Sequence, residues 1–162
     1  MRATRFNHVS VRASDLEKSV KWYEDIFGVT RLPAPNFGFN VGWLKLGDMQ
    51  LHVFEHDCAS NQFSHFGIDV DDFEAIYLRA KRQGCLANDA FNKHHLFETP
   101  SGQLQLYIRD PAGNLIEVNW PDATSINRDV VKDIRKLADI HAQNEANRIA
   151  KLSIGAAKAA KG

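Results

Sequence analysis

Residues Phe6–Val29 read FNHVSVRASDLEKSVKWYEDIFGV, and residues Phe63–Cys85 read FSHFGIDVDDFEAIYLRAKRQGC. The two stretches match from their first residue, so that His8 and His65 take the same place in each. Both begin with a short alternation of apolar and polar residues, which predicts a strand, and continue with the apolar spacing of an amphipathic helix. The chain therefore contains an internal duplication of a strand followed by a helix.

The predicted helices carry start and stop signals of the same kind in both copies. Ser14–Glu17 and Asp71–Glu74 have the spacing of a capping box, in which two side chains satisfy free amides of the first helical turn. Gly28 and Gly84 follow the last apolar residue of each helix, where a glycine in the left-handed conformation commonly ends a helix. We expect each helix to run between these signals.

Further strands are expected after each helix, separated by turn residues. Their approximate ranges are 38–46 and 49–55 in the first copy, and 102–109 and 115–120 in the second. The duplication predicts an α+β fold built from two tandem βαβββ modules, at about 5–56 and 63–120. We expect the modules to form a curved mixed sheet shaped as a cup, followed by a C-terminal helix.

One face of the predicted sheets carries an ionisable residue near the middle of each of four strands. Side chains alternate between the two faces of a strand, and the face opposite these residues is apolar throughout. The four ionisable residues are His8, His52, His65 and Glu117. His8 is equivalent to His65, and His52 is equivalent to Glu117. Aromatic residues flank them, which favours a binding site over a plain solvated face.

Three imidazoles and a carboxylate suit a divalent ion such as Fe, Mn, Ni, Co or Zn. A single histidine on a strand is more often a surface or core residue than a ligand. Four residues in register across a repeat favour a metal site at His8, His65 and Glu117. The assignment of His52 is weaker, because Gln50 lies on the same face and has an amide oxygen that can take its place.

The chain resembles the vicinal oxygen chelate superfamily over about residues 5–121. The resemblance is carried by FNHVSVRASDLEKSVKWY from Phe6, LGDMQLHV from Leu46, FSHFGIDV from Phe63 and YIRDPAGNLIEV from Tyr107. That superfamily includes glyoxalase I, methylmalonyl-CoA epimerase, fosfomycin-resistance and bleomycin-resistance proteins, and extradiol dioxygenases. The resemblance implies metal ligands at His8, His65 and Glu117. A fourth family ligand, usually Glu or Gln, falls where this chain has His52.

The resemblance implies an enzyme that uses its metal to bind adjacent oxygens of a small-molecule substrate. With four protein ligands we expect a glyoxalase-like lyase or isomerase. With three, the two histidines and one carboxylate suit an Fe(II) extradiol-type ring-cleaving dioxygenase. A small-molecule or drug-binding resistance protein is a further alternative.

We take Tyr107 and Glu117 as the candidate catalytic residues, since a tyrosine at this offset resembles a substrate-contacting residue of the family. The alternative is a tyrosine buried for packing. His94 and His95 are either acid/base groups or, more simply, solvated loop histidines.

The segment after Pro121 is expected to lie outside the 1–121 domain. Residues 122–162 are interpreted as a helical extension with a loose tail, the helix running from about 127 to 151 and the tail from 155 to 162. Its apolar stripe comprises Val130, Val131, Ile134, Leu137, Ala138 and His141. That stripe covers either the chain's own sheet or a second subunit, and with the family resemblance it predicts a homodimer.

The charge balance excludes some partners. Lys and Arg together number 20 and so do Asp and Glu, so the formal net charge is +0. A neutral chain offers no general attraction to nucleic acid or to an anionic membrane. The N-terminal residues lack the apolar core of a signal peptide, and the two cysteines do not suggest a disulfide framework. We therefore expect a cytoplasmic protein without nucleic-acid or membrane partners.

Overall fold

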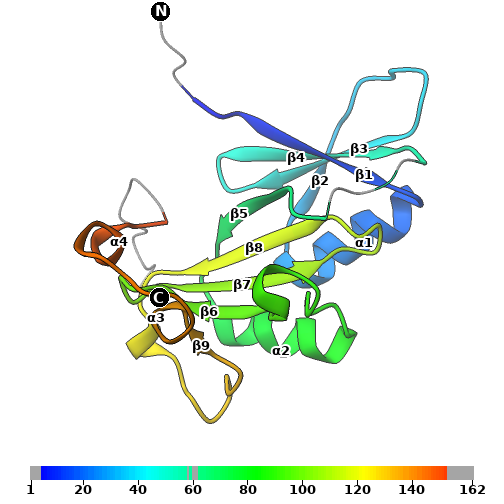
Figure 1. Cartoon of the computed structure of the whole chain (residues 1–162). Helices are drawn as coiled ribbons and strands as arrows, with labels where there is room; N and C mark the ends of the chain where they lie inside the picture. The colour runs from blue at the N-terminus through cyan, green and yellow to red at the C-terminus, as the bar shows by residue number, and fades with distance from the viewer. Residues whose placement is uncertain (1–4, 58, 60–61, 153–162) are drawn as a thin grey trace, which may run out of the picture. The chain divides into compact units, whose positions relative to one another are not determined.

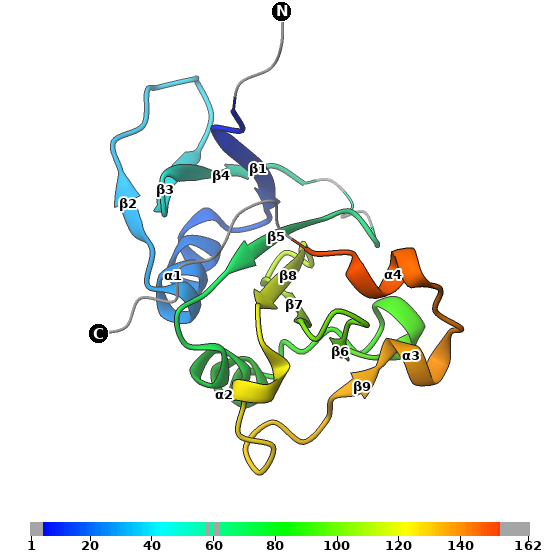
Figure 2. The same ribbon diagram turned by 90° about the vertical axis from the view of Figure 1, so that its left-hand side faces the viewer.

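The computed structural model describes residues 5–57, 59 and 62–152 (Figure 1). These residues form two compact units, which follow the predicted duplication except for one exchanged segment. The first unit comprises Met1–Ser64 together with Arg109–Asn114, and the second comprises His65–Ile108 and Leu115–Gly162. Figure 2 shows the same elements from a second direction.

The first unit contains one helix and a four-stranded mixed sheet. Its elements are β1 (His8–Ala13), α1 (Leu16–Phe27), β2 (Thr30–Leu32), β3 (Val41–Leu46) and β4 (Met49–Glu55). The strand order is β1-β4-β3-β2, with β1 parallel to β4 and the other pairs antiparallel. This is a complete βαβββ module, in which the three-residue strand β2 had not been located from sequence.

The second unit repeats this plan and adds a short strand. Its elements are β5 (His65–Asp69), α2 (Phe73–Gln83), the 3-10 turn η1 (Phe91–Lys93), β6 (Leu96–Glu98), β7 (Leu104–Arg109), β8 (Leu115–Trp120), the 3-10 turn η2 (Ala123–Ser125) and β9 (Arg135–Lys136). The order is β5-β8-β7-β6-β9, and β5 is parallel to β8. The predicted α+β class with two βαβββ modules is confirmed.

Both helices end where the sequence predicts, but each begins one residue later than predicted. Asp15 accepts a hydrogen bond from the Lys18 amide, and Asp72 accepts one from the Ala75 amide, so these aspartates are the N-caps. Gly28 and Gly84 have φ angles of 64° and 67°, the left-handed conformation that favours glycine at a helix end. The predicted capping boxes starting at Ser14 and Asp71 were therefore displaced by one position.

The predicted helix over 127–151 is wrong. The structure instead has two short helices, α3 (Leu137–Ile140) and α4 (Glu145–Ile149), preceded by an extended segment that includes β9. Strand β9 pairs in parallel with β6, and Val131 is 1% exposed in the core of the second unit. β-Branched residues are modest helix formers, and these tertiary contacts outweigh the local spacing.

No helix in the described part of the chain is long and apolar enough to cross a membrane. The residues assigned to a loose tail, 155–162, lie outside the described residues. The extension after residue 121 pairs with β6 and belongs to the second unit. A domain boundary at residue 121 therefore stays a prediction.

Candidate functional site

The strand registers confirm that the two modules place their candidate ligands at equivalent positions. In the first unit, His52 on β4 lies opposite Ser10, two residues after His8 on β1. In the second unit, Glu117 on β8 lies opposite Gly67, two residues after His65 on β5. Each module thus brings together one pair: His8 with His52, and His65 with Glu117.

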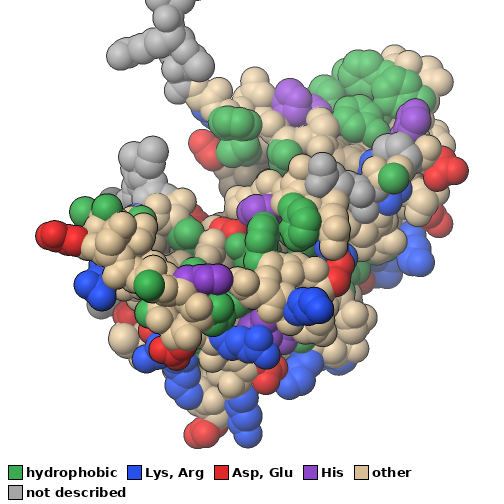
Figure 3. All heavy atoms as spheres, in the orientation of Figure 1, with side chains coloured by type: hydrophobic (Ala, Val, Ile, Leu, Met, Phe, Trp, Pro, Cys, Tyr) green, Lys and Arg blue, Asp and Glu red, His purple; other side chains and the backbone are tan. Residues whose placement is uncertain are grey.

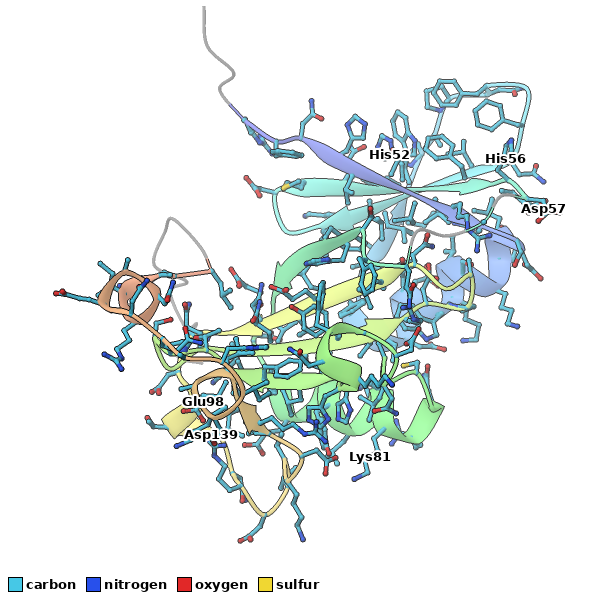
Figure 4. All side chains as sticks on the ribbon, in the orientation of Figure 1. His52, His56, Asp57, Lys81, Glu98 and Asp139 are labelled. Carbon is cyan, nitrogen blue, oxygen red and sulfur yellow. The ribbon has the colours of Figure 1, made fainter. Side chains whose placement is uncertain are left out.

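In the first unit, the His52 ring lies between two other rings. Its centroid is 4.3 Å from that of His8, with an interplanar angle of 13°, and 4.5 Å from that of Trp43, with an angle of 7°. Trp43 is the cross-strand neighbour of His52 on β3, so the two side chains share one face of the sheet. Burial, and secondarily the charge of His8, lower the pKa of His52. Figure 4 labels His52 on β4.

The stacking limits what the first pair can do together. Imidazole lone pairs lie in the ring planes, so two nearly parallel stacked rings do not point at one common ion. His52 also donates from Nε2 to Gln50 Oε1 at 2.8 Å, while His8 Nδ1 lies 2.6 Å from Asn7 Oδ1. His8 is exposed and has room to turn out of the stack, whereas His52 is 8% exposed. Joint coordination by this pair therefore requires His8 to rotate.

The second pair has the separation expected of two ligands on one cation. His65 Nε2 lies 3.3 Å from Glu117 Oε2. Metal–ligand bonds of about 2.0–2.2 Å place neighbouring ligand atoms roughly 3 Å apart. Glu117 is 7% exposed, and a buried carboxylate needs a hydrogen-bonded or charged partner. The donor chemistry and spacing of His65 and Glu117 fit a divalent ion.

Tyr107 on β7 is both buried and engaged with this pair. Its hydroxyl donates to Glu117 Oε2 at 2.6 Å, and its ring packs in a core cluster with Phe97 and Leu115. Burial, followed by the contact with Glu117, raises the pKa of Tyr107 far above its ordinary value. The structure therefore combines the two interpretations of Tyr107 made from sequence, a packed side chain and a residue beside the candidate ligands.

Among residues 5–57, 59 and 62–152, no three His, Cys, Asp or Glu side chains form a group that would hold a metal ion. The four predicted ligands are distributed as two pairs, one in each compact unit. Their assignment to one metal site stays a prediction.

An aromatic cluster beside the first pair was not identified from sequence. Phe37 and Phe39, in the loop between β2 and β3, are 48% and 53% exposed. They contact each other, and through Trp43 and Phe54 they adjoin His52. Hydrophobic side chains gather over this loop in Figure 3. The sequence PAPNFGFN could have indicated this cluster, because its two phenylalanines occur in a proline-rich loop outside any strand or helix.

His94 and His95 are buried at 8% and 5% exposure, so their interpretation as solvated loop histidines is wrong. His94 Nε2 donates to the backbone carbonyl of Asp133 at 2.5 Å, and His95 Nδ1 donates to Asn88 at 2.7 Å. The Asp133 carboxylate accepts a 2.6 Å hydrogen bond from the Tyr77 hydroxyl. This cluster fastens the C-terminal extension to the second unit.

The sequence is similar to a protein family and to individual proteins whose activities have been named. A family model described as the Glyoxalase/Bleomycin resistance protein/Dioxygenase superfamily matches residues 5–118. The chain is 29% identical to a probable trivalent organoarsenical cleaving enzyme of Bacillus subtilis (strain 168), over 75% of this chain and 83% of that protein. It is also 29% identical to the metallothiol transferase FosB of Lysinibacillus sphaericus (strain C3-41), over 72% and 82%.

Among solved structures, the chain is similar to a lactoylglutathione lyase from Agrobacterium tumefaciens. The TM-score is 0.56 at 24% sequence identity, and the match covers 74% of this chain and 95% of that one. This likeness supports the fold.

Proposed function

Because the chain belongs to the Glyoxalase/Bleomycin resistance protein/Dioxygenase superfamily, we propose that it is a divalent-metal-dependent enzyme acting on a small substrate with adjacent oxygen atoms. The observation that carries the proposal is the contact between His65 and the buried carboxylate of Glu117, which is matched by His8 and His52 in the first module. Its relatives include proteins named as a cleaving enzyme and a transferase.

The proposed ligands are His8, His65 and Glu117, with His52 as the fourth. Imidazole and carboxylate ligands suit Fe, Mn, Ni, Co or Zn. Such an ion, when bound, polarises a substrate oxygen as a Lewis acid. The proposal takes one pair of ligands from each unit and rests on their equivalence in the repeat.

Tyr107 has a defined part in this proposal. Its hydroxyl is a hydrogen-bond donor in the structure, and burial together with the contact to Glu117 raises its pKa, which favours the protonated form. In the described structure that proton is directed at Glu117 Oε2, which orients the carboxylate and occupies one of its lone pairs. Only if the hydroxyl turns away from Glu117 can the same proton be donated to a substrate oxygen that gains negative charge.

The leading reaction class is a glyoxalase-like lyase or isomerase. It is supported by the place of His52, which occupies in the first module the position of Glu117 in the second. Four protein ligands leave few positions open, which favours polarisation of a chelated carbonyl over reactions that also need an oxygen molecule at the ion.

A second candidate is an Fe(II) ring-cleaving dioxygenase, and a separate observation favours it. His52 is stacked between His8 and Trp43, and its Nε2 is bonded to Gln50, so the pair does not point at one ion. If His52 stays in that stack, His8, His65 and Glu117 are the set of two histidines and one carboxylate with open positions.

Metal analysis tests the proposal. We expect purified protein incubated with Zn(II) or Fe(II) and then dialysed to retain about one ion per chain. The variants His65→Ala and Glu117→Gln should lose it, while His141→Ala, which changes an exposed histidine, should not. Equal metal content in wild type and both site variants would overturn the proposal. Retention by His52→Ala would select the three-ligand set.

Activity then separates the reaction classes. A lyase or isomerase is expected to act with Ni(II) or Zn(II) on the hemithioacetal of methylglyoxal and glutathione, or on a related α-hydroxycarbonyl compound. A dioxygenase should consume oxygen with Fe(II) and catechols. Tight binding of a small aromatic drug without turnover in either assay would select the binding-protein alternative.

We also propose a cytoplasmic location. It is supported by the two cysteines in 162 residues, which give no sign of the disulfide scaffold common in secreted domains.

A further inference from the structure

We propose that Phe37, Phe39, Trp43 and Phe54 form a stacking subsite that binds an uncharged, planar aromatic group of the substrate beside His8 and His52. This inference rests on the proposed function, because it assigns the ring-bearing part of the substrate to the first unit. It specifies the chemical class of substrate, which the candidate ligands alone do not.

The four rings form a connected series. Phe37 and Phe39 stack with their centroids 5.8 Å apart and an angle of 22°. Phe37 lies 6.2 Å from Trp43, and Phe39 lies 5.8 Å from Phe54. These separations fall within the range of favourable aromatic contacts, about 4.5–7 Å. The four rings therefore form one continuous aromatic surface, on whose outer faces another ring can stack.

The outer end of the series is exposed. Phe37 and Phe39 leave about half of their surface in contact with solvent, although each would gain stability from burial. Two adjacent exposed phenylalanines form a small apolar surface of the kind that marks a ligand or partner site. Figure 3 shows this hydrophobic surface with histidine side chains beside it.

The inner end of the series reaches the candidate ligands. Trp43 stacks on His52, and His52 stacks on His8. A substrate ring that lies on the phenylalanines would therefore be next to a series of rings that ends at the imidazoles of His52 and His8.

The absence of charged side chains from the segment that carries three of these rings further restricts the class of ligand. Residues 33–44 read PAPNFGFNVGWL and contain no charged side chain. Pro33 and Pro35 fix two backbone φ angles of the loop, which lowers the entropy lost when it closes on a ligand. The surface therefore suits a neutral ring more than a phosphorylated or acidic group.

The competing occupant is a second copy of this chain, for which exposed phenylalanines would also be suitable. The substrate is favoured because the same series continues from the exposed rings to both candidate ligands of this unit. A surface used only for self-association has no need of that continuity.

Binding of two probes with identical oxygen atoms tests the inference. Calorimetric titration of the full chain with catechol and with 2,3-dihydroxynaphthalene, each with and without Zn(II), measures what the second ring contributes. We expect the naphthalene probe to bind about tenfold more tightly. The double variant Phe37→Ala/Phe39→Ala should lose that preference, and Phe37→Leu/Phe39→Leu should lose most of it because leucine keeps apolar area without a ring face.

Leu78→Ala is the matched control, since Leu78 on α2 is 47% exposed and belongs to the second unit. It should keep the tenfold preference. An unchanged preference in the alanine variant overturns the inference, as does full preference in the leucine variant. So does a dimer that dissociates in the alanine variant without any change in probe binding. Because the measured quantity is a ratio of two probes, it remains readable in metal-free protein even if the metal proposal fails.

Discussion

The hydroxyl of Tyr107 donates a 2.6 Å hydrogen bond to Oε2 of Glu117. The same carboxylate oxygen lies 3.3 Å from His65 Nε2, so this one atom contacts both the Tyr107 hydroxyl and the second candidate ligand, His65. A side chain that holds a ligand in this way restricts its rotation and keeps its lone pair directed. Tyr107 is thus a positioning residue for Glu117 as well as a candidate contact of the substrate.

Replacement of Tyr107 by phenylalanine should weaken metal binding. Without the hydroxyl, Glu117 loses its orienting donor, and loss of such outer partners typically lowers metal affinity about 10–100-fold. Competition with a chelating dye measures the change. Tyr77→Phe is the control, because it removes a hydroxyl of the same unit that is bonded to Asp133 instead. Equal affinity in both variants would contradict the positioning role.

Replacement of Asp110 by alanine should destabilise the protein by about 3 kcal/mol. Asp110 is 5% exposed and accepts hydrogen bonds from the Tyr23 hydroxyl, the amides of Ala112 and Asn114, and the Asn114 side chain. Buried donors left without an acceptor cost about 1–3 kcal/mol each. Urea unfolding measures the loss. Tyr23→Phe, which removes only one of these bonds, should cost roughly 1 kcal/mol.

Stability should fall as the pH is lowered from about 6.5 toward 4, partly through His95. Burial, and secondarily the charge of His94, lower the pKa of His95 to about 4. The unfolded chain, with an ordinary histidine pKa of about 6.5, therefore takes up a proton first, which favours unfolding. Below the folded pKa no further loss arises from this residue. The full effect is at most about 3 kcal/mol.

The measurement for His95 is urea unfolding at several pH values between 7.5 and 4. The variant His95→Gln should show a shallower decline than wild type, whatever its stability at pH 7.5. His141→Gln, at an exposed position, should keep the wild-type slope. Parallel curves for wild type and His95→Gln would show that the buried ring does not govern this range.

We predict that the full chain is a homodimer at micromolar concentration, which sedimentation velocity can determine. The predicted helix over 127–151 no longer supports this expectation, because much of that segment is bound within its own unit through β9, Val131 and Asp133. A chain stopped after Pro121 should accordingly unfold more easily, since β6 would lose its parallel neighbour. A monomeric full chain would refute the dimer.

The duplication, the C-terminal ends of the two helices and the equivalence of the candidate ligands could all be predicted from the sequence. They depend on local spacing and on glycine conformation, which act within a few residues. Strands β2 and β6 have three residues each, too short to show a period. The 127–151 segment was misassigned because its apolar spacing is helical, whereas its conformation is set by contacts with β6 and α2.

The site was only partly predictable for a similar reason. The pairing of β3 with β4 places His52 and Trp43 on one face, and alternation along each strand predicts neither that pairing nor the stacking of the two rings. The hydrogen bond from Tyr107 to Glu117 also depends on how two strands are paired. Phe37 and Phe39 lie in a proline-rich loop, where no periodic rule assigns a side chain to a face.

The assignment of residues 109–114 to the first unit affects when that unit can finish folding during synthesis. Tyr23 is made early, but its acceptor Asp110 lies 87 residues later, in the turn that belongs to the first unit. Asn114 of that turn also donates to the backbone carbonyl of Arg12, 102 residues away. Domains usually fold in the order in which they leave the ribosome. Here the N-terminal unit has to wait, incomplete, until most of the second module has been translated.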